Sequence, residues 1–195
     1  MSSLSETSRQ LKAEAEQIVR RLRLVECLAQ YGDAEVVGSI ALDLVVKRDI
    51  DIHVVVEPGK LLSVCDEVCS GWRQLCPETN VHCGDYRDCG GIKVGVDSFA
   101  GPSGPWSIDI WITDNPTITG FALLHDLKGR LSPQMREAIL EIKAHYNALG
   151  MLRNGLSRRI YYAVADHGVL TLEDFERFAA SDKAGRQPGD GQPLG

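Results

Sequence analysis

No stretch of the sequence approaches the roughly 20 consecutive apolar residues that a membrane-spanning helix needs. The first residues, MSSLSETSRQLKAE, are polar and lack the apolar core of a secretion signal. We therefore predict a cytoplasmic protein that does not bind membranes. The length of 195 residues fits one α/β domain with a small helical appendage.

Positive charge is also scarce, because 21 Lys and Arg stand against 27 Asp and Glu and leave a formal net charge of −6. General nucleic-acid binders usually carry a basic stripe. The charge balance therefore argues against nucleic acid and favours a small molecule or a protein as partner. The chain also contains no GxSxG, GxxxxGK(S/T) or GxGxxG motif, so the sites that depend on these motifs are not supported.

The sequence has no CxxC pair among its six cysteines, which are Cys27, Cys65, Cys69, Cys76, Cys83 and Cys89. A zinc ribbon is therefore not supported. Cys65 and Cys69 lie on the apolar face of a predicted helix over residues 60–75, where buried free thiols are the simplest interpretation. His82, Cys83 and Cys89 form a loose group that stays a weak metal candidate.

What the sequence does contain is a strand with acidic residues on one face, residues 49–56 (DIDIHVVV). Successive strand side chains point to opposite faces, so Asp49, Asp51 and His53 share the face opposite to the isoleucines and valines. Carboxylates at i and i+2 stand about 7 Å apart and repel each other, and aspartate is a poor strand former. A divalent cation such as Mg²⁺, which prefers carboxylate oxygens, would offset this cost.

A third carboxylate, Asp109, lies on a second predicted strand over residues 106–112 (WSIDIWI), opposite to its isoleucines. If the two strands pair in the matching register, Asp49, Asp51 and Asp109 converge. Three carboxylates are enough to hold two metal ions about 3.5–4 Å apart, the arrangement that clamps the attacking and leaving oxygens in phosphoryl chemistry. Asp97, at the end of a strand over residues 91–97, is the weaker competitor, and His53 is interpreted as a polar residue at the sheet rim.

A Gly-Ser turn, Gly38-Ser39, lies between a short strand end and a predicted helix over residues 40–46. Glycine lets the backbone approach a ligand closely, and the N–H groups at a helix start point at an anion. An ordinary turn with Ser39 as N-cap is the alternative. The acidic strand that follows favours phosphate binding.

These residues form one spaced pattern. It consists of Gly38-Ser39, nine residues, Asp49-Ile50-Asp51-Ile52, and a later strand-borne Asp109. The pattern resembles the signature of the nucleotidyltransferase superfamily, which includes DNA polymerase β and the kanamycin and lincosamide nucleotidyltransferases. The resemblance covers about residues 30–112 of the chain.

The resemblance implies an enzyme that moves a nucleoside monophosphate from an NTP such as ATP to a hydroxyl of a small-molecule acceptor and releases pyrophosphate. Asp49 and Asp51 would bind the metal on the triphosphate, and all three aspartates would share a second Mg²⁺ or Mn²⁺. Asp109 would also act as base or orient the hydroxyl. A lysine from the helical part would contact the triphosphate, with Lys143 preferred and Lys128 as rival.

The predicted fold class is α+β, with a nucleotidyltransferase-type mixed sheet and flanking helices. Residues 1–115 form the core, residues 116–180 a helical C-terminal part, and residues 181–195 a disordered tail. We expect a first helix over residues 8–30 and a connecting loop over residues 98–105. The strands on either side of that loop should form an antiparallel hairpin.

Two other functions remain open at this point. The resemblance to the superfamily also allows a protein acceptor, as in the small nucleotidyltransferases of toxin–antitoxin pairs that transfer AMP to a partner, although this chain is longer than their minimal forms. A non-catalytic, nucleotide-binding member of the fold is the second alternative, and the presence of all three carboxylates counts against it.

Overall fold

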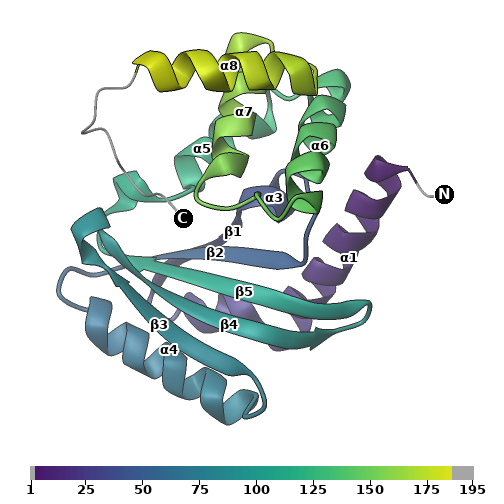
Figure 1. Cartoon of the computed structure of the whole chain (residues 1–195). Coiled ribbons are helices and arrows are strands. Elements are labelled where there is room, and N and C mark those ends of the chain that lie inside the picture. Colours follow the sequence, from purple (N-terminus) through teal and green to yellow (C-terminus); the bar gives the residue numbers. More distant parts are fainter. Residues whose placement is uncertain (1–2, 186–195) are drawn as a thin grey trace.

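The computed structural model of the chain describes residues 3–185 and has a five-stranded mixed sheet at its centre (Figure 1). The strands are β1 (Gly32–Val37), β2 (Asp49–Val56), β3 (Asn80–Tyr86), β4 (Gly91–Gly101) and β5 (Gly104–Thr113). Their order in the sheet is β1-β2-β5-β4-β3. The central strands β2 and β5 are parallel, and the other neighbouring pairs are antiparallel. The mixed sheet with flanking helices confirms the predicted α+β class.

One face of the sheet is apolar and is buried under helices. The side chains of Ile50, Ile52 and Val54 on this face are fully buried because β2 alternates apolar and polar residues. The covering helices are α1 (Leu4–Leu22), α2 (Leu24–Leu28) and α4 (Leu61–Leu75). Figure 1 shows α4 below the sheet, and its apolar residues belong to the same core cluster as those of β2.

A second hydrophobic core lies among the helices after the sheet, which Figure 1 shows above it. These helices are α5 (Phe121–Lys128), α6 (Pro133–Ala148), α7 (Leu156–His167) and α8 (Leu172–Gly185). Two short 3₁₀ helices, η1 (Arg87–Cys89) and η2 (Pro116–Ile118), flank β4 and β5 in the chain. Leu42 and Leu44, which follow the short helix α3 (Gly38–Ala41), also pack in this second core. The segment between β1 and β2 therefore ties the helical part to the sheet.

The predicted single helix over residues 8–30 is wrong in one respect, because it is two helices. Arg23 breaks it with a left-handed backbone (φ 50°), and its N–H bonds to the carbonyls of Val19 and Arg20. Glycine usually occupies such a helix-ending position. Since Arg23 stands there instead, no residue in the sequence signals the break.

The predicted loop over residues 98–105 is also wrong. β4 continues to Gly101 and β5 begins at Gly104, so the two strands form the predicted antiparallel hairpin with a much tighter turn. A shift in register between Val96 and Phe99 marks a bulge, where Ser98 has a φ of 60°. The glycines and prolines of this stretch therefore mark a tight hairpin turn rather than a long loop, and the bulge lies at Asp97 and Ser98.

Two further predictions concern the C-terminal tail and membrane-spanning helices. α8 extends to Gly185, so the first residues of the predicted tail are helical, and residues 186–195 lie outside the described part. Within residues 3–185, no helix is both long and apolar enough to cross a membrane.

Candidate active site

The pairing of β2 with β5 brings the three predicted aspartates together. In the parallel register Asp51 lies opposite Asp109, and Asp49 precedes Asp51 on the same face of β2. One carboxylate oxygen from each of the three lies within 4.8 Å of the others. We refer to Asp49, Asp51 and Asp109 as the carboxylate cluster.

Lysines neutralise part of the charge of the carboxylate cluster. Lys47 forms an ion pair with Asp49, and the Nζ atom of Lys93 lies 2.9 Å from Oδ2 of Asp109. Asp51 lies between the other two carboxylates, because Asp49 precedes it on β2 and Asp109 is its partner on β5. Burial and the neighbouring charges of Asp49 and Asp109 raise the pKa of Asp51 to about 7. The cluster is therefore crowded with negative charge that a divalent cation would relieve.

Gly38 lies directly against the carboxylate cluster. Its φ of +66° is left-handed, and a Cβ atom at this position would lie 2.7 Å from Oδ2 of Asp51. Only glycine combines this backbone conformation with so close an approach to the carboxylate. Because Gly38 lies directly against Asp51, the Gly-Ser turn and the acidic strand belong to one site.

Ser39 lies inside the first turn of α3, which covers Gly38–Ala41 rather than residues 40–46 as predicted. The N-cap of this helix is Val37, so the alternative in which Ser39 serves as N-cap does not describe the structure. The carbonyl of Ser39 accepts a hydrogen bond from the N–H of Leu44 at 2.8 Å. This bond closes the short loop that leads from the glycine toward β2.

Lys143 of α6 lies behind this loop and is almost completely buried, with 2% of its surface exposed. Its Nζ atom donates to the carbonyl of Leu44 at 2.6 Å and to the hydroxyl of Tyr161 at 2.8 Å. Burial lowers the pKa of Lys143 to about 7, and the charges of Asp51 and Asp49 oppose this shift. The buried amine therefore faces the carboxylate cluster from the helical side.

The other residues that the sequence offered as site candidates lie outside the carboxylate cluster. His53 accepts a hydrogen bond at Nδ1 from the N–H of Gly120 at 2.9 Å, and burial lowers its pKa to about 4, so it is neutral at pH 7. Asp97 contacts His82, with Oδ2 3.4 Å from Nδ1. Lys128 is exposed on α5. His53 is therefore a hydrogen-bonded polar residue as predicted, but it lies within β2 between Glu35 and Trp111 rather than at the rim of the sheet.

Two partners of the site were missed by sequence reasoning. Lys93 lies on β4 on the same face as Asp109, because Lys93 pairs with Trp111 and Gly95 pairs with Asp109. The alternation of Lys93 with buried valines placed its side chain on the polar face, but the pairing register was needed to bring it to Asp109. Tyr161 follows the buried Ile160 on α7. Only the packing of α7 against α6 shows that the hydroxyl of Tyr161 accepts a hydrogen bond from Nζ of Lys143.

The donor set suits Mg²⁺ or Mn²⁺. Three carboxylates supply only oxygen ligands, which hard divalent cations prefer. Burial and the charges of Asp49 and Asp109 both raise the pKa of Asp51, and a bound cation would offset both effects. The observed cluster therefore fits a metal site of the kind that the sequence predicts.

Three solved structures of nucleotidyltransferases have the same fold, and two of the three are of the same polymerase. The chain resembles the Cid1 poly(U) polymerase bound to MgGTP, with 15% identity and a TM-score of 0.59, over 80% of this chain and 49% of that one. It also resembles a Cid1 mutant bound to MgATP, with 13% identity, a TM-score of 0.61 and the same coverage. The third is a cytoplasmic RNA terminal U-transferase, with 13% identity and a TM-score of 0.56, over 83% of this chain and 53% of that one.

The chain has the nucleotidyltransferase fold. It spans about half the length of the structures that it resembles. No protein-family profile and no curated protein sequence matches it. The likeness therefore concerns the arrangement of helices and strands, and the activity must be argued from the site itself.

Proposed function

We propose that the chain is a nucleotidyltransferase that moves a nucleoside monophosphate from an NTP to a hydroxyl group. The observation that carries this proposal is the carboxylate cluster, in which three aspartates from two paired strands bring their oxygens within 4.8 Å. Mg²⁺ or Mn²⁺ ions bound there would neutralise the triphosphate and the leaving pyrophosphate. The nucleotidyltransferase fold supports the same conclusion.

The residues of the chain have separate roles in this reaction. Asp49 and Asp51 would hold the ion on the triphosphate, and Asp109 would join them in holding a second ion. The acceptor oxygen forms a bond to the α-phosphorus while the bond to the leaving pyrophosphate breaks. Asp109, whose side chain is more exposed than that of Asp49, would take the proton of the attacking hydroxyl or orient it.

The Gly-Ser turn and Lys143 would bind the phosphates. At Gly38 the absence of a side chain leaves room beside Asp51, where a phosphate bound to the same ion must approach. Ser39 follows in the first turn of α3, where backbone N–H groups face outward from the helix start. Lys143 adds positive charge from behind the loop, and its contact with Tyr161 keeps the amine in place.

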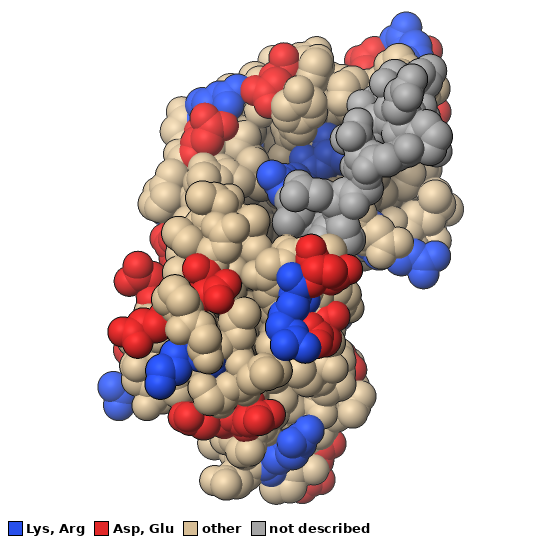
Figure 2. Space-filling model, turned by 90° about the vertical axis from the view of Figure 1, so that its left-hand side faces the viewer, with Lys and Arg blue, Asp and Glu red and all other residues tan. Residues whose placement is uncertain are grey.

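A small molecule is our proposed acceptor. The chain carries a formal net charge of −6, whereas a protein that tracks a nucleic-acid backbone needs a basic surface. On the described part of the face in Figure 2, acidic and basic side chains are interspersed rather than gathered into a basic stripe. A compact acceptor that needs few phosphate contacts suits such a surface better.

RNA is the second candidate acceptor, because the three similar structures are RNA-extending enzymes by name. A 3′-terminal hydroxyl of RNA would enter the same reaction in place of a small-molecule hydroxyl. This candidate differs in its dependence on salt. Transfer to RNA should weaken steeply as the salt concentration rises, and transfer to an uncharged small acceptor should not.

The test begins with NTP binding, measured by calorimetry with and without Mg²⁺ on the parent chain and on Asp49→Ala/Asp51→Ala. We expect binding that requires the metal and disappears in the double variant. Labelled NTPs are then offered together with short RNAs and with hydroxyl-bearing small molecules, and the products are separated by size. Labelled small molecules would support our acceptor, and extended RNA would replace it with the second candidate.

The outcome that would overturn the proposal is also clear. A folded parent chain that binds no NTP in the presence of Mg²⁺ would contradict nucleotidyl transfer. Binding without any transfer to either acceptor class would favour the non-catalytic alternative. Circular dichroism of the double variant provides the control that the sheet is intact.

A further inference from the structure

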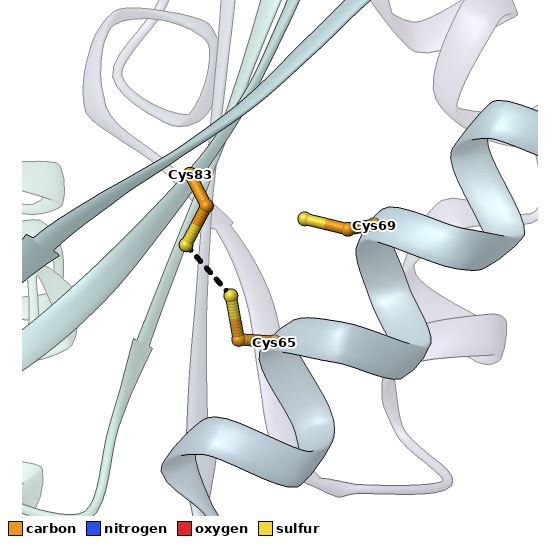
Figure 3. Close-up of side chains that lie close together, drawn as sticks. All are labelled: Cys65, Cys69 and Cys83. Carbon is orange, nitrogen blue, oxygen red and sulfur yellow. Dashed lines mark hydrogen bonds between the residues drawn. The ribbon is translucent and has the colours of Figure 1, made fainter.

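Three cysteines from two elements come together beneath the outer strands of the sheet. Cys65 and Cys69 are one turn apart on α4, and Cys83 projects from β3 toward them (Figure 3). Their sulfur atoms all lie within 4.8 Å of one another. We refer to Cys65, Cys69 and Cys83 as the thiol cluster.

The thiol cluster is separate from the carboxylate cluster. Residues on β3 pair with β4 so that His82 lies opposite Gly95, which in turn lies opposite Asp109. His82 therefore shares the face of the carboxylates, and its neighbour Cys83 points to the other face, against α4. The group His82, Cys83 and Cys89 considered from the sequence is thus replaced by a set in which only Cys83 remains.

The sulfurs lie close enough together to bind one tetrahedral metal ion after a small movement of Cys83. With Zn–S bonds of about 2.3 Å, two thiolates on one tetrahedral ion lie about 3.8 Å apart. The observed Sγ–Sγ distance between Cys65 and Cys83 is 2.8 Å, and the third sulfur is within 4.8 Å of both. Cys83 is exposed, so a small rotation of its side chain opens the pair to the required spacing.

The position of the cluster gives a metal ion a structural task. β3 is an edge strand, and each of its residues is exposed or only partly buried, so apolar packing holds it weakly. By contrast, Cys65 and Cys69 are 3% and 4% exposed and belong to the main hydrophobic core. A bond from Cys83 through a metal to these two residues would fasten the edge strand to the core.

We propose that the thiol cluster is a zinc site that pins β3 to α4. Cys65, Cys69 and Cys83 would bind the ion as thiolates, each releasing its proton to solvent as its bond to zinc forms. The exposed side at Cys83 provides the entry path and leaves the fourth position to water. Three sulfur ligands select soft or borderline cations such as Zn²⁺ over Mg²⁺, so the two clusters would take different metals.

The test is a titration of the reduced, metal-free full-length chain with Co²⁺, which reports sulfur ligands through sulfur-to-metal charge-transfer absorption. Asp49→Asn/Asp51→Asn in the same chain removes the carboxylate cluster as a competing site. We expect one equivalent of sulfur-bound Co²⁺ in this background, displaced by one equivalent of Zn²⁺. Cys83→Ser should abolish the absorption, and Cys27→Ser, another exposed cysteine, should leave it unchanged.

Hydrogen exchange gives a second readout that does not depend on spectroscopy. Zn²⁺ at 100 times its dissociation constant should slow exchange about 100-fold at those amides of β3 whose opening requires release of the ion. Cys83→Ser should lose this protection. Because residue 83 is exposed, this variant is expected to fold even if substitutions at the buried positions do not.

Three results would overturn the proposal. One is the absence of sulfur-bound Co²⁺ in the parent chain. Another is undiminished Co²⁺ absorption in Cys83→Ser. The third is a mass lower by two hydrogens after exposure to oxygen together with no metal binding under reducing conditions, which would make the contact between Cys65 and Cys83 an oxidisable pair instead.

Discussion

The carboxylate cluster and the thiol cluster lie on opposite faces of the sheet, and repulsion between their closely spaced groups is avoided in different ways. The carboxylate cluster is charged, so it lies partly exposed and is accompanied by Lys47, Lys93 and the buried Lys143. The thiol cluster lies against the hydrophobic core, where burial raises the pKa of Cys65 and Cys69 and keeps them neutral. Protonated thiols behave as small apolar groups and need no counter-ions.

This difference explains why one cluster could be located from the sequence and the other could not. Two carboxylates on one strand stand out because they violate the preferences of a buried strand. Two cysteines on the apolar side of a helix violate nothing, so their sequence pattern is that of ordinary core residues. Four predictions test this difference between the two clusters, and the strongest effect comes first.

The largest effect should follow removal of a carboxylate. Asp51→Asn should lower the rate of nucleotidyl transfer on the order of 10³-fold, about 4 kcal/mol, because a metal ligand is lost. Transfer is measured as pyrophosphate release with the acceptor found in the screen. Cys69→Ser, which changes only the thiol cluster, should retain the parent rate.

Asp97→Asn is the matched control for this prediction. Asp97 lies on the neighbouring strand β4, but its partners are Asn80 and His82 rather than the carboxylate cluster. A loss of transfer in Asp97→Asn that equals the loss in Asp51→Asn would contradict the assignment of the third carboxylate to Asp109.

Acidification should weaken metal binding next most strongly. Since the pKa of Asp51 is about 7 without metal, its carboxylate gains a proton below that pH, and Mg²⁺ affinity should fall about tenfold per pH unit between pH 7 and 5. Calorimetry at several pH values measures this. His53 does not contribute, because with a pKa of about 4 it stays neutral over this range.

The thiol cluster should respond to pH more steeply. Up to three protons leave when three thiols bind Zn²⁺, so its affinity should change by more than tenfold per unit over the same range. Equal slopes for the two metals, or a Mg²⁺ affinity that does not vary between pH 7 and 5, would contradict the contrast drawn between the clusters.

Loss of the buried amine should have an intermediate effect. Lys143→Met should raise the KM for NTP about tenfold, or 1.4 kcal/mol, with a smaller change in kcat, because positive charge facing the triphosphate is removed. Lys128→Met removes an exposed lysine from the same helical part and should leave KM unchanged. The reverse result would assign the triphosphate contact to Lys128.

The smallest effect concerns the stability of the metal-free chain. The pKa of Asp51 is raised from 3.8 to about 7 in the folded state, so between pH 4 and 7 the unfolded chain loses this proton first. Stability from this group is therefore present below pH 4 and is lost as the pH rises through 7. At pH 8 with a chelator, Asp51→Asn should relieve about 1 kcal/mol of repulsion and raise Tm by about 2–4 °C.

A thermal melt with added Mg²⁺ is the control, because the metal relieves the same repulsion in the parent chain and should cancel the difference. Cys69→Ser should move Tm in the other direction, since it places a hydroxyl in the apolar core. A lower Tm for Asp51→Asn in chelator would show that the carboxylate is already stabilised without a cation.

Much of the fold around the carboxylate cluster could be predicted because it rests on local periodicity. The bounds of β2 match the predicted strand over residues 49–56, and the start of α6 follows its Ser132 cap, whose side chain accepts from the N–H of Met135. The break at Arg23 and the bulge at Ser98 could not be predicted in the same way. Both depend on a left-handed backbone at a residue other than glycine, and neither residue type indicates that conformation.

Which side chains share the acidic face of β2 follows from the sequence alone, because alternation along a strand is set by the geometry of the chain. The sequence also places the Gly38-Ser39 turn shortly before the two carboxylates of that strand. The tertiary structure was needed to show that Asp109 lies opposite Asp51, that Lys93 and Lys143 flank them, and that Cys83 meets α4. The physical reason is that register and packing between distant segments are set by the burial of whole apolar faces, and no single residue carries that information.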